Sequence, residues 1–275
     1  MAGTLHAFLV LLPLLSQSSA SSRIDSVTLN SVLFNGHYEF LDLSYPFDNN
    51  TVYWPGNTKF QFTKKKEEFI GKNYSWYAAN EFAAAEHGGT HLDAPYHFFM
   101  MGTHIGEIPL EKLIIPLIIV DISSKVNDDP NYILYKHDLD YLINDNMGQP
   151  CVIIFKFGWS KHYNSAKYLG IDDHTKTLNF PGLSAEVVEW ITTSYKNVVG
   201  IGVDVASVDP GSSTDFPVHK ITSRSGLYNI ENVNLSLPVP DHGCTALVMP
   251  MKIAEGTGAP LRLVAICPKK IPESF

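Results

Sequence analysis

Short runs of β-branched and apolar residues recur beyond residue 110 and are separated by polar loops. Such runs are typical of buried strands, and they span residues 114–122, 151–157, 198–205, 246–249 and 261–267. Helical periodicity is sparser and predicts helices over residues 138–144 and 184–195, the second with Ser184 at its N-cap. The pattern predicts a strand-rich α/β domain.

The N-terminus has a different pattern. Residues 1–20 contain no charged side chain, carry an apolar run over residues 8–15 and then become small and polar. This predicts a secretory signal peptide, a secreted protein and one mature domain over residues 21–275. The run is too short for a good membrane span, and the alternative is an extension that stays attached. Three glycosylation sequons agree with secretion, at Asn49, Asn73 and Asn234.

Charge and cysteine content narrow the function classes. Twenty Lys and Arg against 28 Asp and Glu give a net charge of −8, and no basic run offers a nucleic-acid footprint. We therefore expect no nucleic-acid partner. Three cysteines are too few for a disulfide framework. Cys151 and Cys267 lie in apolar runs and are predicted to be buried thiols, although one disulfide with one thiol is the alternative.

Candidate metal ligands are concentrated in one stretch, residues 87–98. Its sequence, HGGTHLDAPYHF, places His87, His91, Asp93 and His97 on one side of an extended chain. At ~3.3 Å per residue a straight strand would spread these side chains too far apart for metal bonds of ~2 Å. The chain must therefore bend, at the two glycines and at the proline. The alternative is a loop with scattered surface histidines.

Further ligands must come from elsewhere if the carboxylate is shared between two metals. Residues 202–210 follow a strand-like run, so their polar side chains lie where α/β folds usually carry active-site groups. His219 and Glu231 lie downstream. From the residues alone, His219 also fits a surface or core histidine, and Glu231 a solvated carboxylate.

The histidine stretch resembles the HxGTHxDxPxHF signature of the metal-dependent cyclase family, which includes bacterial-type kynurenine formamidases and isatin hydrolases. Four other segments are similar to family segments, so the resemblance spans roughly residues 40–267. These segments are Leu43-Ser44-Tyr45-Pro46 with Trp54-Pro55-Gly56, then Phe157-Gly158-Trp159, residues 202–210 and Gly258-Ala259-Pro260-Leu261-Arg262.

The resemblance implies a fold and a set of roles. The fold is a swivelling β/β/α fold, with a small β-barrel-like core flanked by helices and assembled as a homodimer or higher homo-oligomer. His87, His91 and Asp93 would bind one metal, Asp93 would also reach a second, and His97 would transfer protons. Trp54 would contact the substrate, the alternative being a half-buried core tryptophan. The metal ligands implied are His87, His91, Asp93, His219 and Glu231.

Histidine and carboxylate ligands without thiolates favour Zn²⁺ or Mn²⁺. Either metal lowers the pKa of bound water from ~15.7 toward ~7, so that hydroxide can attack a carbonyl while His97 protonates the leaving amine. The leading prediction is hydrolysis of an N-formyl aryl amide such as N-formylkynurenine. The alternatives are isatin hydrolase-like or polyketide-type cyclase activity, and a secreted metal-binding protein without catalysis. An aryl-binding wall is predicted from Tyr53, Trp54, Tyr96, Phe98 and Phe99.

Overall fold

The computed structural model describes residues 28–139 and 149–269. The chain divides after His37 into two units. In the first unit, helix α1 (Leu29–Leu33) begins at Thr28, whose hydroxyl accepts a hydrogen bond from the Ser31 amide. The predicted signal peptide lies outside the described residues. No helix in the described part of the chain is both long and apolar enough to cross a membrane.

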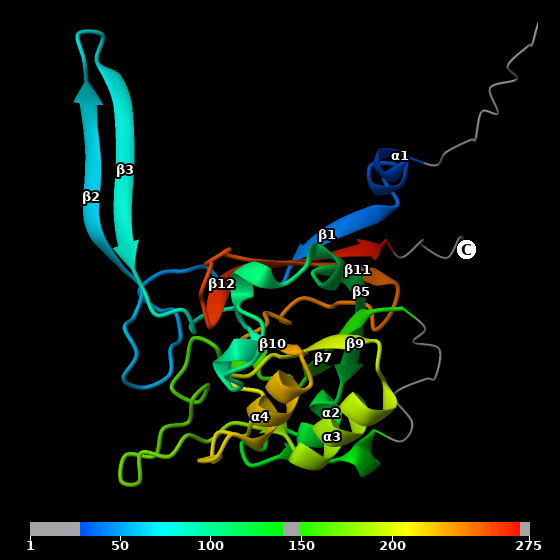
Figure 1. Cartoon of the computed structure of the whole chain (residues 1–275). Coiled ribbons are helices and arrows are strands. Elements are labelled where there is room, and N and C mark those ends of the chain that lie inside the picture. Colours follow the sequence, from blue (N-terminus) through cyan, green and yellow to red (C-terminus); the bar gives the residue numbers. More distant parts are fainter. Residues whose placement is uncertain (1–27, 140–148, 270–275) are drawn as a thin grey trace, which may run out of the picture. The chain divides into compact units, whose positions relative to one another are not determined.

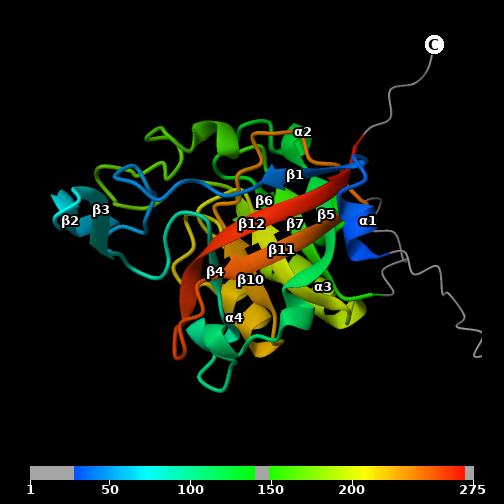
Figure 2. The same ribbon diagram turned by 90° about the horizontal axis from the view of Figure 1, so that it is seen from above.

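The second unit is built on an eight-stranded sheet in which seven strands close into a barrel, confirming the predicted fold class (Figure 1). The ring closes because β12 pairs with both β11 and β4, and β1 pairs with β12 outside the ring. The strands are β1 (Tyr38–Asp42), β4 (His91–Asp93), β5 (Ile114–Asp121), β7 (Cys151–Lys156), β9 (Val198–Val203), β10 (Tyr228–Glu231), β11 (Cys244–Pro250) and β12 (Gly258–Pro268). Figure 2 shows β12 crossing the sheet between β1 and β11.

Strand β7 shows how the sequence builds two hydrophobic cores. It lies between the parallel neighbours β5 and β9, and both of its faces are buried. Val152 and Ile154 belong to the cluster inside the barrel, whereas Ile153 and Phe155 belong to the cluster under the helices. A strand buried on both faces is continuously apolar rather than alternating, which is why residues 151–157 gave a clear signal.

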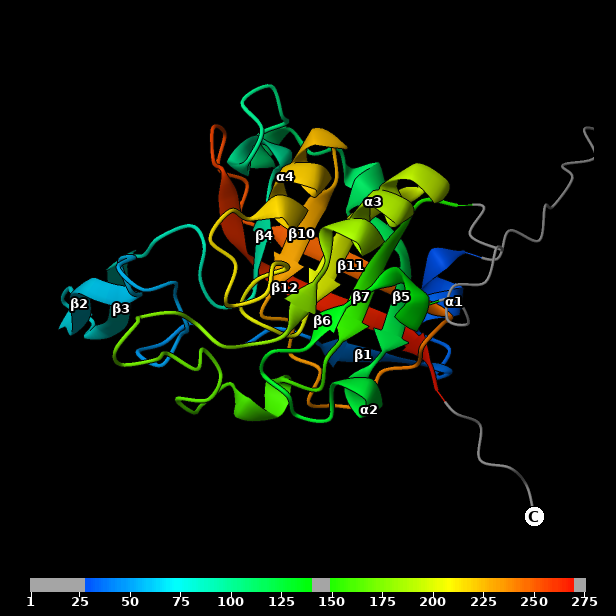
Figure 3. The same ribbon diagram turned by 90° about the horizontal axis from the view of Figure 1, so that it is seen from below.

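Helices cover the outer face of the parallel strands. They are α2 (Ser123–Val126), α3 (Ala185–Ser194) and α4 (Pro217–Arg224), of which α3 and α4 lie side by side (Figure 3). The predicted cap of α3 is present, because the Ser184 hydroxyl accepts a hydrogen bond from the Val187 amide at 3.2 Å. Val187, Val188 and Ile191 are its buried residues. The helix predicted over 138–144 falls mostly outside the described residues.

The five predicted strands correspond to β5, β7, β9, β11 and β12, with shifted ends. Strand β9 stops at Val203 because the chain turns at Asp204, whose carboxylate accepts hydrogen bonds from the amides of Phe157 and Trp159. The remaining elements are short: β6 (Ile133–Leu134), β8 (Gly182–Leu183) and the 3₁₀ turns η1 (Pro95–His97), η2 (Ile105–Glu107), η3 (Leu110–Lys112), η4 (Lys136–Asp138) and η5 (Ser160–His162).

One large element was not predicted. Strands β2 (Gln61–Ile70) and β3 (Ser75–Ala83) form an antiparallel hairpin that extends away from the barrel (Figure 1). All the residues of β2 are exposed, as are those of β3 before Ala83. The run of three lysines and two glutamates in β2 masks the alternation that marks a half-buried strand.

The cysteine prediction was wrong in one respect. Cys244 and Cys267 form a disulfide between β11 and β12. The antiparallel register pairs Thr245 with Ile266 and so places the two cysteines opposite each other, with Cα atoms 4.2 Å apart. Cys267 is therefore not a thiol, and the alternative of one disulfide and one thiol is correct. Cys151 is a buried thiol, as predicted.

Candidate metal centre and substrate pocket

The histidine stretch bends as its glycines and proline require. Gly88 lies under the ring of Tyr53, where an added Cβ would be 2.0 Å from the ring carbon Cε1. Gly89 has a φ of +55°, a conformation that favours glycine. Beyond β4, Pro95 starts the 3₁₀ turn η1, which ends at His97. The two turns bring the ends of the stretch together, since the rings of His87 and His97 stack with centroids 4.0 Å apart.

Strand β4 carries the central ligand candidates because it closes the barrel between β10 and β12. In this register His91 lies opposite both Glu231 and Pro260, and Asp93 lies opposite Gly258. Leu92 packs in the barrel interior. His91 and Asp93 therefore point to the opposite side, where the side chain of Glu231 meets them.

His219 reaches the same point from α4. The Asp209 carboxylate accepts hydrogen bonds from the amides of Val218 and His219 at the start of that helix, and from His219 Nδ1 at 2.7 Å. Phe216, which precedes the helix, has a positive φ of 50°. Asp209 thus fixes both the helix end and the orientation of the imidazole.

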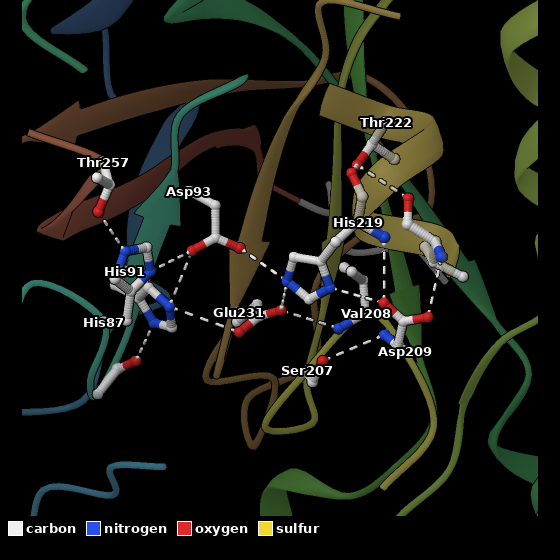
Figure 4. Close-up of polar contacts among 12 residues, drawn as sticks. His87, His91, Asp93, Ser207, Val208, Asp209, His219, Thr222, Glu231 and Thr257 are labelled. Atoms are coloured by element: carbon white, nitrogen blue, oxygen red, sulfur yellow. Dashed lines mark hydrogen bonds and ion pairs between the residues drawn. The ribbon is translucent and has the colours of Figure 1, made fainter. Parts of the chain in front are cut away.

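Asp93 is the centre of the cluster (Figure 4). Its Oδ1 lies 2.7 Å from His87 Nδ1 and 3.2 Å from His91 Nε2, and its Oδ2 lies 3.2 Å from His219 Nε2. Glu231 Oε1 is 3.1 Å from the same His219 nitrogen. The structure therefore brings together all five residues named as metal ligands, and the site is buried: Asp93 is 2% exposed and Glu231 5%.

The hydrogen bonds on the far side of each imidazole indicate which nitrogen carries a proton. His91 Nδ1 faces the Gly89 carbonyl at 3.0 Å, and His219 Nδ1 faces the Asp209 carboxylate. The Thr257 hydroxyl donates to Glu86, so it must accept from His87 Nε2. Each histidine thus places its proton away from the cluster and a nitrogen lone pair toward the carboxylates.

A histidine nitrogen lone pair and a carboxylate repel each other unless a positive charge lies between them. His91 Nε2 and Asp93 Oδ2 are buried and make no hydrogen bond to any described residue. Burial alone would lower the pKa of His91, but Asp93 and Glu231 raise it to about 9. Either extra protons or a cation must balance the two carboxylates, and a divalent metal does this with the donors present. The residues fit such an ion.

Two groups of possible ligand atoms share Asp93. Within each group the ligand atoms lie within 4.8 Å of one another. One group is His91, Asp93 and Glu231, with His219 beside it; the other is His87, Asp93 and His97. His97, named from sequence as the proton-transfer residue, therefore also lies within ligand range. Burial lowers the pKa of His97 to about 4, which keeps its imidazole neutral.

A pocket of about 200 Å³ opens onto this cluster. Trp54 and Phe98 line it as predicted, together with Phe216, whose ring centroid is 5.8 Å from that of Trp54 and 5.6 Å from that of Phe98. Trp54 also packs edge-on against Phe180 of the core under the helices. Trp54 is therefore half-buried against the core, as the alternative interpretation has it, and it also lines the pocket; its contact with a substrate stays a prediction.

The predicted aromatic wall is only partly correct. Tyr53 lines the pocket, but Tyr96 and Phe99 are not among its lining residues. Tyr96 instead lies against His104, with ring centroids 3.8 Å apart. The 3₁₀ turn η1 accounts for Tyr96, because residues two apart, such as Tyr96 and Phe98, share one side only while the chain stays extended.

Several residues that shape the site were missed. Asp209 lies within the segment over residues 202–210, where nothing in the sequence distinguishes it from the other polar residues, and Phe216 precedes a helix that has no clear periodicity in the sequence. Thr257 and Glu86 carry no local signal, since their roles depend on contacts across more than 160 residues: their hydrogen bond spans 171 positions and that of Thr257 to His87 spans 170.

Comparisons with known proteins agree with the resemblance. The putative cyclase family matches residues 41–210. The kynurenine formamidase of Bacillus cereus is 26% identical over 228 residues, covering 82% of this chain and 96% of that protein. The isatin hydrolase of Roseibium aggregatum is 25% identical over 268 residues, covering 91% and 99%.

A solved structure shows the same fold. Isatin hydrolase A from Ralstonia solanacearum has a TM-score of 0.78 and 24% identity, covering 91% of this chain and 99% of that one. The family match spans more than half of the chain and includes the histidine stretch on β4. This protein therefore belongs to the putative cyclase family.

Proposed function

We propose that this protein is a metal-dependent hydrolase that cleaves the amide bond of an N-formyl aryl amide such as N-formylkynurenine. The observation that carries the proposal is the position of Asp93, which is shared by two groups of ligand atoms at a small pocket with an aromatic wall. The similarity to kynurenine formamidase over 82% of the chain supports this substrate class.

Five side chains would hold the metal in this proposal. His91, His219 and Glu231 would hold one ion and His87 a second, and Asp93 belongs to both groups of ligand atoms. When bound, Zn²⁺ or Mn²⁺ acidifies a water molecule and polarises a carbonyl oxygen. The site suits either ion because its ligands are imidazoles and carboxylates.

The remaining steps belong to the chain's own residues. His97 lies at the pocket wall beside His87, in a position to take a proton from the attacking water and deliver it to the leaving amine nitrogen. Trp54, Phe98 and Phe216 hold the aryl ring of the substrate, and their apolar faces exclude bulk water from the reacting bond.

Opening of a cyclic amide is the second candidate. Isatin hydrolase relatives match a larger share of this chain, 91% against 82%, and both reactions break a carbonyl carbon–nitrogen bond. The pocket of about 200 Å³ favours a compact ring substrate as much as a formyl amide.

The test measures metal content together with hydrolysis of N-formylkynurenine and of isatin by the purified protein, with and without a chelator. We expect one or two equivalents of metal and chelator-sensitive turnover of N-formylkynurenine at the higher kcat/KM. A higher kcat/KM for isatin than for N-formylkynurenine would favour the cyclic amide over the N-formyl amide as the substrate. Full metal content with turnover of neither compound would contradict both.

We also propose that the protein enters the secretory pathway. The Cys244–Cys267 disulfide supports this, because such bonds persist in oxidising compartments. The sequon residues Asn49 and Asn73 are exposed, as a glycan requires. Mass spectrometry of the native protein should find an N-terminus within a few residues of Ser21. An intact N-terminus on unglycosylated protein would contradict the proposal.

A further inference from the structure

A larger groove adjoins the substrate pocket. Its volume is about 700 Å³, against about 200 Å³ for the pocket over the ligand cluster. The two spaces share three lining residues, Val52, Tyr53 and Leu169. A substrate whose reacting group lies in the pocket can therefore extend past these residues into the groove.

The groove carries one charge of each sign, and neither is paired. Asp48 and Lys59 both line it, and both are exposed. Neither side chain forms an ion pair with the other or with any further residue in the described part of the chain. Asp48 is held in place, because its Oδ1 accepts a hydrogen bond from the Asn50 amide at 2.7 Å and its own amide donates to the Thr51 hydroxyl at 2.8 Å. A ligand with both an ammonium and a carboxylate would satisfy both charges.

A buried hydroxyl at the groove lacks an acceptor. Tyr163 lines the groove, although the residue is only 6% exposed. Its hydroxyl oxygen accepts a hydrogen bond from the Val52 amide at 3.3 Å, but its proton has no acceptor among the described residues. Burial raises the pKa of this hydroxyl to about 12, so it stays protonated at neutral pH. It can therefore donate to a carboxylate that enters the groove.

The two adjoining spaces match the two halves of the proposed substrate. The aryl formamide of N-formylkynurenine fits the aromatic pocket, and its side chain ends in a zwitterionic α-amino acid group. We propose that the groove is a subsite for this tail, in which Asp48 binds the ammonium and Lys59 and Tyr163 bind the carboxylate. The inference rests on the proposed function and adds the residues that select a substrate with a tail. Isatin has no tail and would use the pocket alone.

The first experiment compares three formamides that differ in the tail. N-formylkynurenine carries both charges, N-formylkynuramine keeps the ammonium but lacks the carboxylate, and 2-(formylamino)acetophenone lacks the whole amino acid group. Wild-type kcat/KM should fall in that order by ~3- to 10-fold at each step, as loss of a partly exposed charged contact does. The protein is assayed in its native glycosylation state, because Asn49 of the first sequon also lines the groove.

The charge variants should act on different members of this series. Lys59→Met and Tyr163→Phe should each lower kcat/KM for N-formylkynurenine ~3- to 10-fold and spare the two compounds without a carboxylate. Asp48→Asn, which keeps an acceptor for the Asn50 amide, should weaken both compounds that carry the ammonium. Lys196→Met, at an exposed lysine outside both spaces, should change none. Variants that slow all three formamides equally, or slow none, would overturn the subsite.

A binding measurement separates failure of the subsite from failure of the proposed function. By calorimetry, the product kynurenine should bind to the wild type more tightly than 2-aminoacetophenone, and Asp48→Asn and Lys59→Met should each reduce this advantage ~3- to 10-fold. Equal binding of the two products, with turnover of N-formylkynurenine intact, would overturn the subsite alone. No turnover of any formamide would contradict the proposed function, and the subsite would then stand only if kynurenine were still the preferred product.

Discussion

The two groups of ligand atoms that meet at Asp93 differ in how they are held. His91, His219 and Glu231 are at most 5% exposed, and they are held by contacts with the Gly89 carbonyl, the Asp209 carboxylate and the Val208 amide. In the other group, His87 is 19% exposed at its side chain and is oriented by the side chains of Thr257 and Glu86, while His97 stacks on His87.

The difference separates a rigid group from an adjustable one. Backbone atoms and a fully buried carboxylate hold the first group, so its ligands are preorganised before any metal arrives. The second group faces the pocket and depends on a threonine hydroxyl that is held by the side chain of Glu86 and not by the backbone. We expect the buried group to bind metal first and more tightly, and the pocket-facing group to serve substrate and proton transfer.

The largest expected effect follows from removing a ligand of the buried group. His91→Ala should abolish metal binding and activity, because Asp93 and Glu231 then lose the imidazole between them. The loss should exceed the ~10- to 100-fold cost of removing a residue that merely orients a ligand. Metal analysis and kcat are measured beside His174→Ala, an exposed histidine outside the site. Full metal content in His91→Ala would contradict the assignment.

His97→Ala should separate metal binding from catalysis. Its loss removes proton transfer, so kcat should fall by ~10² to 10⁴ while the buried group keeps its metal. Metal stoichiometry and kcat are measured on this variant and on His91→Ala. If His97→Ala loses all of its metal, His97 is primarily a ligand and another group moves the proton. If it keeps both metal and rate, His97 has neither role.

Features that depend on neighbouring residues could be predicted from the sequence, whereas features that depend on distant residues could not. The bends of the histidine stretch could be predicted, because Gly88, Gly89 and Pro95 lie where the backbone must turn. Strands buried on both faces, such as β7, gave continuous apolar runs. The disulfide could not be foreseen, since it depends on the register of β11 and β12. Nor could Thr257, which the barrel brings to His87 from 170 positions away.

The hairpin was hidden for a different reason. In β2 a run of lysines and glutamates, which lie on both faces, separates Phe62 from Phe69, and the register shifts between Phe62 and Lys64. A shift of one residue moves side chains to the other face, so a two-residue period cannot be followed through it. The amphipathic character becomes visible only after the cross-strand partners are known.

Asp209→Asn probes the support of the buried group. The change keeps one acceptor oxygen for the start of α4 but removes the charge that holds His219 Nδ1 at 2.7 Å. Metal affinity should fall ~10- to 100-fold, and metal should still bind at saturating concentration. Titration with Co²⁺, followed by absorbance, measures the affinity. A variant with wild-type affinity would show that the helix alone positions His219.

The smallest effect is expected at Thr257, which orients the pocket-facing group. Thr257→Val keeps the side-chain shape but removes the hydroxyl that joins His87 Nε2, at 2.8 Å, to Glu86. The His87 tautomer is then no longer fixed, so the more weakly bound metal equivalent should lose affinity by ~10-fold while the tighter one is unchanged. Thr257→Ser keeps the hydroxyl and should behave as wild type in the same Co²⁺ titration. Equal weakening of both equivalents would mean that the two groups act as one rigid site, and the distinction between them would fail.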